Sequence, residues 1–444
     1  MRTIDIYPLI DQARFGRTHW MIMFWCALLL IFDGYDLFIY GVVLPVLMQE
    51  WNLTPLQAGA LGSYALFGMM FGALLFGSLA DRIGRKKGIA LCFALFSVAT
   101  LLNGFAQNPT EFGIYRFIAG LGCRGLMPNA VALMNEYAPK RARSTLVAIM
   151  FSGYSLGGML SAGLGIYMLP RFGWESMFFA AAIPLLLLPL ILYCLPESIG
   201  FLVRQGRTQE AQTWLQRVNP DYRPMAGDQL QAHDAQSTKG VSVTALFKNG
   251  LAVRTLALWL AFFCCLLMVY ALSAWLPKLM ANAGFSLGSS LSFLLALNFG
   301  GMTGAILGGW LGDRYNLVKV KIAFFLVAAA SISLLGMNSP MPILYGLIFI
   351  AGATTIGTQI LLYAGAAQLY GLSVRSTGLG WASGIGRNGA IVGPLLGGAL
   401  MSIQLPLQLN FIAFAIPGAI AALAMAVHLA SGKQPVRPKL PATA

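Results

Sequence analysis

The stretch GSLADRIGRKK at residues 77–87 closes the apolar segment 56–80. A weaker copy, GWLGDR at residues 309–314, closes a second apolar segment and is followed by Lys319 and Lys321. Both copies read Gly-x-x-x-Asp-Arg at the end of an expected helix, and they lie 232 residues apart in a chain of 444 residues. A pattern that recurs after about half of the chain predicts an internally duplicated protein.

The apolar segments around these motifs are long enough to cross a membrane, since ~20 helical residues at ~1.5 Å each span the ~30 Å hydrocarbon core. Hydrophobic residues make up 58% of the chain and charged residues 10%, which excludes a water-soluble enzyme. We predict an all-α polytopic membrane protein with twelve transmembrane helices in two pseudo-symmetric six-helix bundles. The twelve segments are residues 20–48, 56–80, 88–106, 112–134, 144–169, 175–195, 251–276, 288–311, 320–337, 341–370, 378–403 and 406–430.

Basic residues are unevenly distributed between the two ends of these segments. With the N-terminus inside, 24 of the 29 Lys and Arg residues fall on cytoplasmic segments, which follows the positive-inside rule. We therefore expect both termini in the cytoplasm and attribute the net charge of +14 to topology and anionic lipid, not to nucleic acid. The expected organisation is a cytoplasmic N-terminus (1–19), a first bundle (20–195), a cytoplasmic linker with a short amphipathic helix from Phe201 to Val218 (196–250), a second bundle (251–430) and a cytoplasmic tail (431–444).

Small residues recur every four positions in segments 2, 5, 8 and 11, which map onto one another under a shift of six. Such stripes let helices approach closely and predict tight packing. The stripes are Gly68 and Gly72; Gly153, Gly157, Ser161 and Gly165; Gly300, Gly304, Gly308 and Gly312; and Gly389, Gly393 and Gly397.

The duplicated motif and the six-plus-six layout resemble the major facilitator superfamily over essentially the whole chain. DGYD at residues 33–36, MPNA at 127–130 and GRNG at 386–389 are similar to the aromatic acid:H⁺ symporters. Within that group, IYGVVLP at 39–45 and FSGYS at 151–155 are most similar to bacterial benzoate transporters.

This resemblance implies a proton-coupled symporter that imports benzoate or a closely related aromatic carboxylate across the bacterial inner membrane by alternating access. It implies that helices 1, 4, 7 and 10 line a central cavity and that helices 2, 5, 8 and 11 form the interface between the halves. Two positions depart from the family pattern: Ile199-Gly200 stands where many relatives have Pro-Arg, and Arg124 stands where glycine is expected. We expect a functional monomer.

Two aspartates, Asp33 and Asp36, lie near the middle of the first segment. An ionised side chain at the bilayer centre costs ~2.5–3.5 kcal/mol on insertion scales, so buried charges are candidates for function. Three residues apart on a helix, the two side chains are ~60° apart and can face one cavity. Because desolvation and a second carboxylate both favour protonation, we predict that this pair couples protons to transport. The alternative is a structural pair satisfied by hydroxyls or a neighbouring arginine.

Three arginines lie inside expected membrane segments. Arg387 is a candidate ligand for the substrate, since a guanidinium can bind a carboxylate through two parallel hydrogen bonds; the alternative is a salt bridge between the halves. Arg116 either binds substrate or pairs with an aspartate of the first segment. Arg124 is expected at the depth of Asp33 and Asp36, where it either pairs with them and slows transport or forms a second carboxylate anchor.

Charged residues at the inner ends of the segments are candidates for a gate that breaks and re-forms, although a static cytoplasmic charge cluster explains them as well. They are Asp81, Arg82, Arg85, Glu136, Arg141, Asp313, Arg314 and Arg375.

A benzoate ring also needs an apolar slot with a polar end. The candidates for lining that slot, against the alternative of plain packing, are Tyr64, Asn129, Tyr154, Tyr270, Asn298, Gln359, Tyr363 and Trp381.

Short motifs that resemble cofactor-binding and catalytic motifs occur in the sequence, but none lies in the structural context that such a motif requires. The two G-x-G-x-x-G runs at 120–125 and 384–389 follow no strand, and G-x-S-x-G at 153–157 lies inside a membrane segment. We expect that the protein is not an enzyme and binds no cofactor and no metal. As partners we expect only an aromatic carboxylate, protons and the lipid bilayer. An efflux antiporter of the same fold for aromatic acids or drugs, and a transporter-like membrane sensor, are the alternatives. A sensor is disfavoured because the linker and tail leave little room for a signalling domain.

Overall fold

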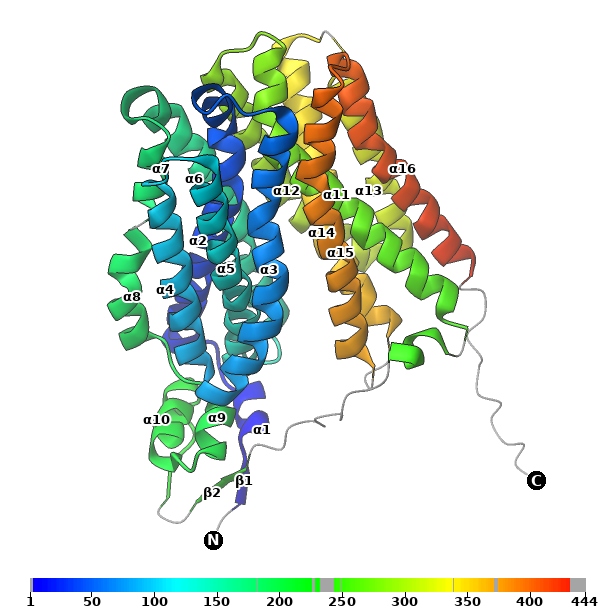
Figure 1. Ribbon diagram of the computed structural model, residues 1–444. Helices are drawn as coiled ribbons and strands as arrows, with labels where there is room; N and C mark the ends of the chain where they lie inside the picture. Colours follow the sequence, from blue (N-terminus) through cyan, green and yellow to red (C-terminus); the bar gives the residue numbers. More distant parts are fainter. Residues whose placement is uncertain are drawn as a thin grey trace, which may run out of the picture.

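The computed structural model describes residues 3–181, 183–225, 228–231, 243–248, 250–337, 339–370 and 374–431. Long helices run side by side in two groups, one on each side of the molecule (Figure 1). Within the described ranges, ten helices are long and apolar enough to cross a membrane. Helices α3 (Pro55–Ile83) and α15 (Arg375–Ser402) complete twelve crossings. The predicted fold class is confirmed.

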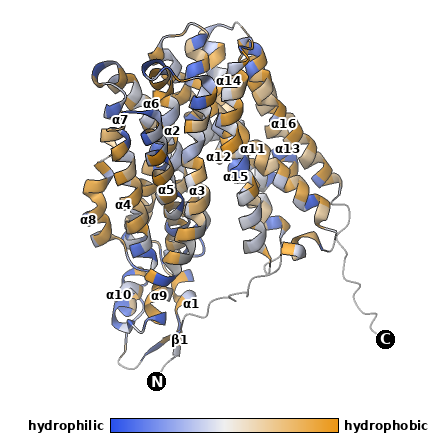
Figure 2. Ribbon diagram, in the orientation of Figure 1, coloured by the Kyte–Doolittle hydropathy of each residue, from blue (hydrophilic) through white to orange (hydrophobic). Residues whose placement is uncertain are grey.

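The first half contains α2 (Arg17–Glu50), α3, α4 (Arg85–Asn103), α5 (Pro109–Tyr137) and α6 (Arg143–Phe172), followed by a sixth crossing in two pieces, α7 (Glu175–Ala180) and α8 (Ile183–Cys194). The second half contains α11 (Ala252–Asn282), α12 (Leu287–Arg314), α13 (Leu317–Leu334), α14 (Met341–Leu369), α15 and α16 (Leu407–Ala430). Hydrophobic residues cover the long helices, whereas hydrophilic residues gather on the short elements at one end (Figure 2).

The short elements occupy the end of the molecule where α2 begins and α16 ends, which we call the linker end; the opposite end is the loop end (Figure 1). They are α1 (Ile6–Asp11), α9 (Ile199–Arg204), α10 (Thr208–Val218), the 3-10 helix η1 (Val243–Phe247), and strands β1 (Thr3–Asp5) and β2 (Gln229–Gln231). The single amphipathic helix predicted from Phe201 to Val218 is wrong, because the chain breaks at Gly206, whose φ of +72° favours glycine. The parallel β1–β2 pair was not predicted.

The glycine stripes pack helices within each half. A Cβ at Gly68, Gly157, Gly300 or Gly389 would lie 2.0 Å from a backbone carbonyl oxygen of α5, α2, α14 or α11, respectively. Each of these partners belongs to the same half as its glycine. The stripes therefore mark close packing as predicted, and these closest approaches are to helices of the same half.

The halves meet through other residues of the same four helices, α3 against α15 and α6 against α12, as the family pattern implies, and also through α2 against α11. Gly398 of α15 approaches the Pro55 carbonyl so closely that a Cβ would lie 2.4 Å from its oxygen, and the Ser63 hydroxyl donates to the Ile391 carbonyl at 2.7 Å. Both contacts lie toward the loop end of α3 and α15. The two halves are therefore joined at the loop end.

Candidate functional site

A cavity of about 110 Å³ lies between the two halves. Its walls come from α2, α3, α5 and α6 of the first half and from α11, α14 and α15 of the second, which include all four helices that the family pattern places there. Most of the wall is apolar or aromatic, with a few charged groups. The lining residues are Asp33, Met69, Cys123, Arg124, Met127, Phe151, Tyr154, Ser155, Tyr270, Ile356, Gln359, Ile360, Tyr363 and Arg387.

Arg387 enters this cavity from the middle of α15 and is 5% exposed. Its Nη1 donates to the Tyr270 hydroxyl at 3.1 Å and lies 3.8 Å from the sulfur of Met69 on the opposite half. The guanidinium makes no ion pair with any side chain that the structure describes. A guanidinium carries five N–H donors, so Arg387 keeps donors for an anion inside the cavity.

Asp33 lies in the same wall, on α2, and is 5% exposed. Arg124 and Arg387 both act on it electrostatically, yet neither makes an ion pair with it among the described side chains. The cavity thus combines one carboxylate with two guanidinium groups, and none of the three is neutralised by direct contact.

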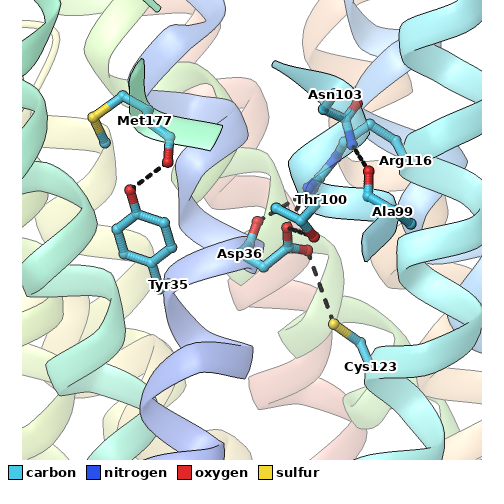
Figure 3. A network of polar contacts seen from close by, with 8 residues as sticks. All are labelled: Tyr35, Asp36, Ala99, Thr100, Asn103, Arg116, Cys123 and Met177. Atoms are coloured by element: carbon cyan, nitrogen blue, oxygen red, sulfur yellow. Dashed lines mark hydrogen bonds and ion pairs between the residues drawn. The ribbon is translucent and has the colours of Figure 1, made fainter. Parts of the chain in front are cut away.

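Asp36 has a different environment, one turn further along α2 (Figure 3). It is fully buried and accepts hydrogen bonds from Arg116 Nη1 at 2.9 Å and Thr100 Oγ1 at 3.0 Å. Arg116 also donates from Nη2 to the Asp36 carbonyl at 3.3 Å, and the Cys123 sulfur lies 3.9 Å from Oδ2. This is a closed network inside the first bundle.

Two predictions change with this network. The expectation that both aspartates face one cavity is wrong, because the ~60° between them turns Asp36 toward α4 and α5 while Asp33 faces the other half. Arg116 pairs with an aspartate of the first segment, which was one of its two predicted roles, and it does not line the cavity.

Arg124 lines the cavity on α5 but makes no ion pair with Asp33 or Asp36 in the part of the chain described. Its Nη2 lies 3.4 Å from the Ser383 hydroxyl on α15, and its Nη1 lies 3.5 Å from the Met127 sulfur. The predicted aspartate pair is therefore wrong in this conformation. Arg124 instead reaches across to the opposite half.

Four other predicted residues also line the cavity: Tyr154, Tyr270, Gln359 and Tyr363. The hydroxyls of Tyr154 and Tyr270 are 3.5 Å apart, so Tyr270 links Arg387 to Tyr154 across the halves. Tyr363 hydrogen-bonds to Ser383 at 3.1 Å. These phenols therefore add hydroxyl groups to a wall that already holds Asp33, Arg124 and Arg387.

Four predicted lining residues lie elsewhere. Tyr64 is 45% exposed in a groove between α3 and α5, and Trp381 is 45% exposed and stacks on Trp259. Asn298 is fully buried against Gly158 at the interface of α12 and α6, and Asn129 is buried and donates to the Gly125 carbonyl at 2.7 Å. The prediction that these four residues line the cavity is wrong, because residue type alone does not determine which face of its helix a side chain occupies.

The prediction missed seven lining residues: Met69, Cys123, Met127, Phe151, Ser155, Ile356 and Ile360. Six of them were detectable from helical spacing. On α14, residues 356, 359, 360 and 363 follow the i, i+3, i+4, i+7 pattern of one face, and residues 123, 124 and 127 of α5 and 151, 154 and 155 of α6 do the same.

The predicted gate residues are distributed over the linker end. Arg85 pairs with Glu136 through Nε at 2.7 Å, within the first half. Arg82, Arg141 and Arg314 are exposed, and the Arg314 guanidinium lies 5.5 Å from the Trp310 ring centre. The side chains of Asp81, Asp313 and Arg375 lie outside the described residues.

The sequence matches the family model for the Major Facilitator Superfamily over residues 26–388 and again over residues 298–444. The chain belongs to this superfamily. It is therefore a membrane transporter, not an enzyme. Members of the superfamily that resemble it in sequence include a benzoate transport protein of Acinetobacter baylyi, 47% identical over 94% of this chain and 91% of the relative. A gallate transporter of Pseudomonas putida is 36% identical over 98% of this chain and 96% of its own length.

Solved structures agree on the fold. A D-xylose-proton symporter superimposes with a TM-score of 0.70 at 18% identity, covering 92% of this chain and 97% of its own. A bacterial homologue of the lysosomal transporter Spinster, in an inward-facing conformation, superimposes with a TM-score of 0.72 at 16% identity, covering 95% of this chain and all of its own. At these identities the likeness shows the fold alone.

Proposed function

We propose that this transporter is a proton-coupled symporter that imports benzoate or a closely related aromatic carboxylate across the bacterial inner membrane by alternating access. The observation that carries the proposal is Arg387, a buried guanidinium in the cavity wall with no carboxylate partner among the described side chains. A buried cation without a counterion is costly, and an anionic substrate supplies the missing charge.

An aromatic acid matches the rest of the wall. Its ring fits between apolar side chains such as Phe151 and Ile356, and its carboxylate reaches the guanidinium and the Tyr270 hydroxyl beside it. The relatives with benzoate, gallate and gentisate in their names support this substrate class.

We assign proton coupling to Asp33. Asp36, paired with Arg116, has a structural role beside it. When the substrate anion neutralises Arg387 and a proton neutralises Asp33, the cavity loses two buried charges, and the cost of moving the halves falls. Each charge that crosses the membrane exchanges ~2.3 kcal/mol per 100 mV. Import of an anion therefore gains from the potential only when more than one proton accompanies it.

The contacts between the halves support alternating access. They are joined at the loop end, and the cavity begins below that junction. With both termini and the linker in the cytoplasm, as the distribution of Lys and Arg favours, this conformation is closed to the periplasm. The exposed arginines at the linker end then belong to the gate that forms when the cytoplasmic side closes, whereas the Arg85–Glu136 pair is already formed within the first half.

Uptake of labelled benzoate into proteoliposomes tests this function. With an inward proton gradient and the membrane potential set to zero, we expect accumulation that a protonophore abolishes. Accumulation that is unchanged by the protonophore would exclude proton coupling. A benzoate gradient that drives protons in the opposite direction would identify an efflux antiporter instead.

A further inference from the structure

An arginine, a lysine and a histidine lie close together at the linker end of the second half, on α11, α13 and α16. Arg254 is in the first turn of α11, Lys321 is near the start of α13, and His428 is in the last turn of α16. Helix α16 packs against both α11 and α13. The His428 Nδ1 lies 3.0 Å from the Arg254 carbonyl oxygen and must donate to it, since a carbonyl only accepts. We call these three residues the basic corner.

In the basic corner Lys321 and His428 are buried and Arg254 is half-buried, and no counterion lies beside them among the side chains that the structure describes. Lys321 is 1% exposed, and its Nζ is directed at Gly365 of α14, where a Cβ would lie 2.3 Å away. Among the described residues the Nε of Arg254 is buried without a hydrogen-bond partner, and the Arg254 charge acts on Lys321. Neither residue makes an ion pair with any described side chain.

The second half contains too few carboxylates to neutralise its basic residues. Residues 251–431 contain seven Lys and Arg residues and one acid, Asp313. A single carboxylate next to Arg314 cannot neutralise Arg314, Arg254 and Lys321 together. A buried lysine beside a half-buried arginine is destabilising unless an anion joins them.

We propose that the basic corner binds a phosphate group. Its three residues lie within about two turns of helix ends, which is the depth of the phospholipid headgroups. Basic pockets between membrane helices at the cytoplasmic face bind anionic headgroups, and a guanidinium with an ammonium suits phosphate oxygens. The phosphate is presented by a phospholipid or comes free from solution, and the two sources are separable by experiment.

The test uses the purified full-length chain, stripped of lipid in detergent, with the midpoint of thermal unfolding as readout. Phosphatidylglycerol, phosphatidylcholine with the same acyl chains, and inorganic phosphate are titrated separately. We compare Lys321→Gln and Arg254→Gln with Lys319→Gln, which removes the same charge from an exposed position on the same helix. Two variants on different helices keep the test valid if one of them fails to fold.

We expect phosphatidylglycerol to raise the unfolding midpoint of the wild type more than phosphatidylcholine does. Lys321→Gln and Arg254→Gln should each weaken its apparent affinity roughly tenfold, the loss of one charge-assisted hydrogen bond, while Lys319→Gln matches the wild type. Stabilisation by inorganic phosphate with the same dependence on the variants would identify a soluble anion as the ligand. Equal effects of Lys319→Gln and Lys321→Gln, or full affinity in both corner variants, would overturn the proposal.

Discussion

The two halves share one fold but differ in whether their buried cations have carboxylate partners. In the first half, buried or half-buried cations meet carboxylates: Arg116 pairs with Asp36 at 2.9 Å, Arg85 with Glu136 at 2.7 Å and Arg143 with Asp11 at 2.6 Å. In the second half, Arg387, Arg254 and Lys321 have no such partner among the described side chains. The sequence contains the same asymmetry, since 14 of the 15 acids precede residue 251.

This difference separates two uses of a buried cation. A cation paired within the protein is satisfied and holds helices together, as Arg116 joins α5 to α2. An unpaired cation leaves a site for an anion that comes from outside the chain. On this view the second half carries two anion sites, Arg387 for the substrate and the basic corner for a phosphate group.

The largest effect should come from breaking a closed pair. Asp36→Asn removes the counterion of the fully buried Arg116, and breaking a buried ion pair costs about 3–5 kcal/mol. We expect a lower unfolding midpoint and no transport. The double variant Asp36→Asn with Arg116→Met should recover part of the stability, because it removes the stranded charge. If the single variant is as stable as the wild type, the pair does not hold the first half together.

The next effect concerns the unpaired carboxylate. Asp33→Asn keeps the shape of the side chain but removes its proton site, so we expect no accumulation of benzoate above equilibrium. Counterflow exchange should continue, because exchange requires no net release of a proton. Both activities are measured in the same proteoliposomes. Normal accumulation by Asp33→Asn would place the proton site elsewhere and would weaken the contrast between Asp33 and Asp36.

Arg387→Lys tests whether the unpaired cation of the second half is a geometric ligand or only a charge. Lysine keeps the charge but lacks the planar set of donors, so affinity for benzoate should fall roughly tenfold to a hundredfold. Arg171→Lys, on the exposed end of α6, is the matched control and should bind as the wild type does. Equal affinity of Arg387→Lys and the control would reduce Arg387 to a point charge.

The fold was predictable because membrane helices and their duplication are patterns along one dimension of the chain. Helical period also tells which residues share a face, and α14 shows that this recovers most of a cavity wall. It does not tell which neighbour that face meets. The glycine stripes therefore predicted close packing without its partners, and Asp33 and Asp36 were placed together although 60° of rotation separates their environments. The partner of Arg124 lies on the other half and has no signal in the sequence at all.

Arg124 should give the smallest effect, and it sharpens the comparison because it is a cavity cation of the first half that has no ion-pair partner among the described side chains. Its contact with Ser383 at 3.4 Å is weak, so Arg124→Gly should change benzoate affinity or uptake by a factor of about 3–10. Ser383→Ala separates the two possible causes, because it removes the contact across the halves and keeps the charge.

If Arg124 is a second anchor for the carboxylate, only Arg124→Gly weakens binding. If Arg124 instead holds the halves together and slows transport, both variants take up benzoate faster and both retain affinity. We expect the first result, because the guanidinium lines the cavity with Asp33 and makes no ion pair with any carboxylate that the structure describes. Faster uptake by both variants would assign Arg124 to the contact between the halves.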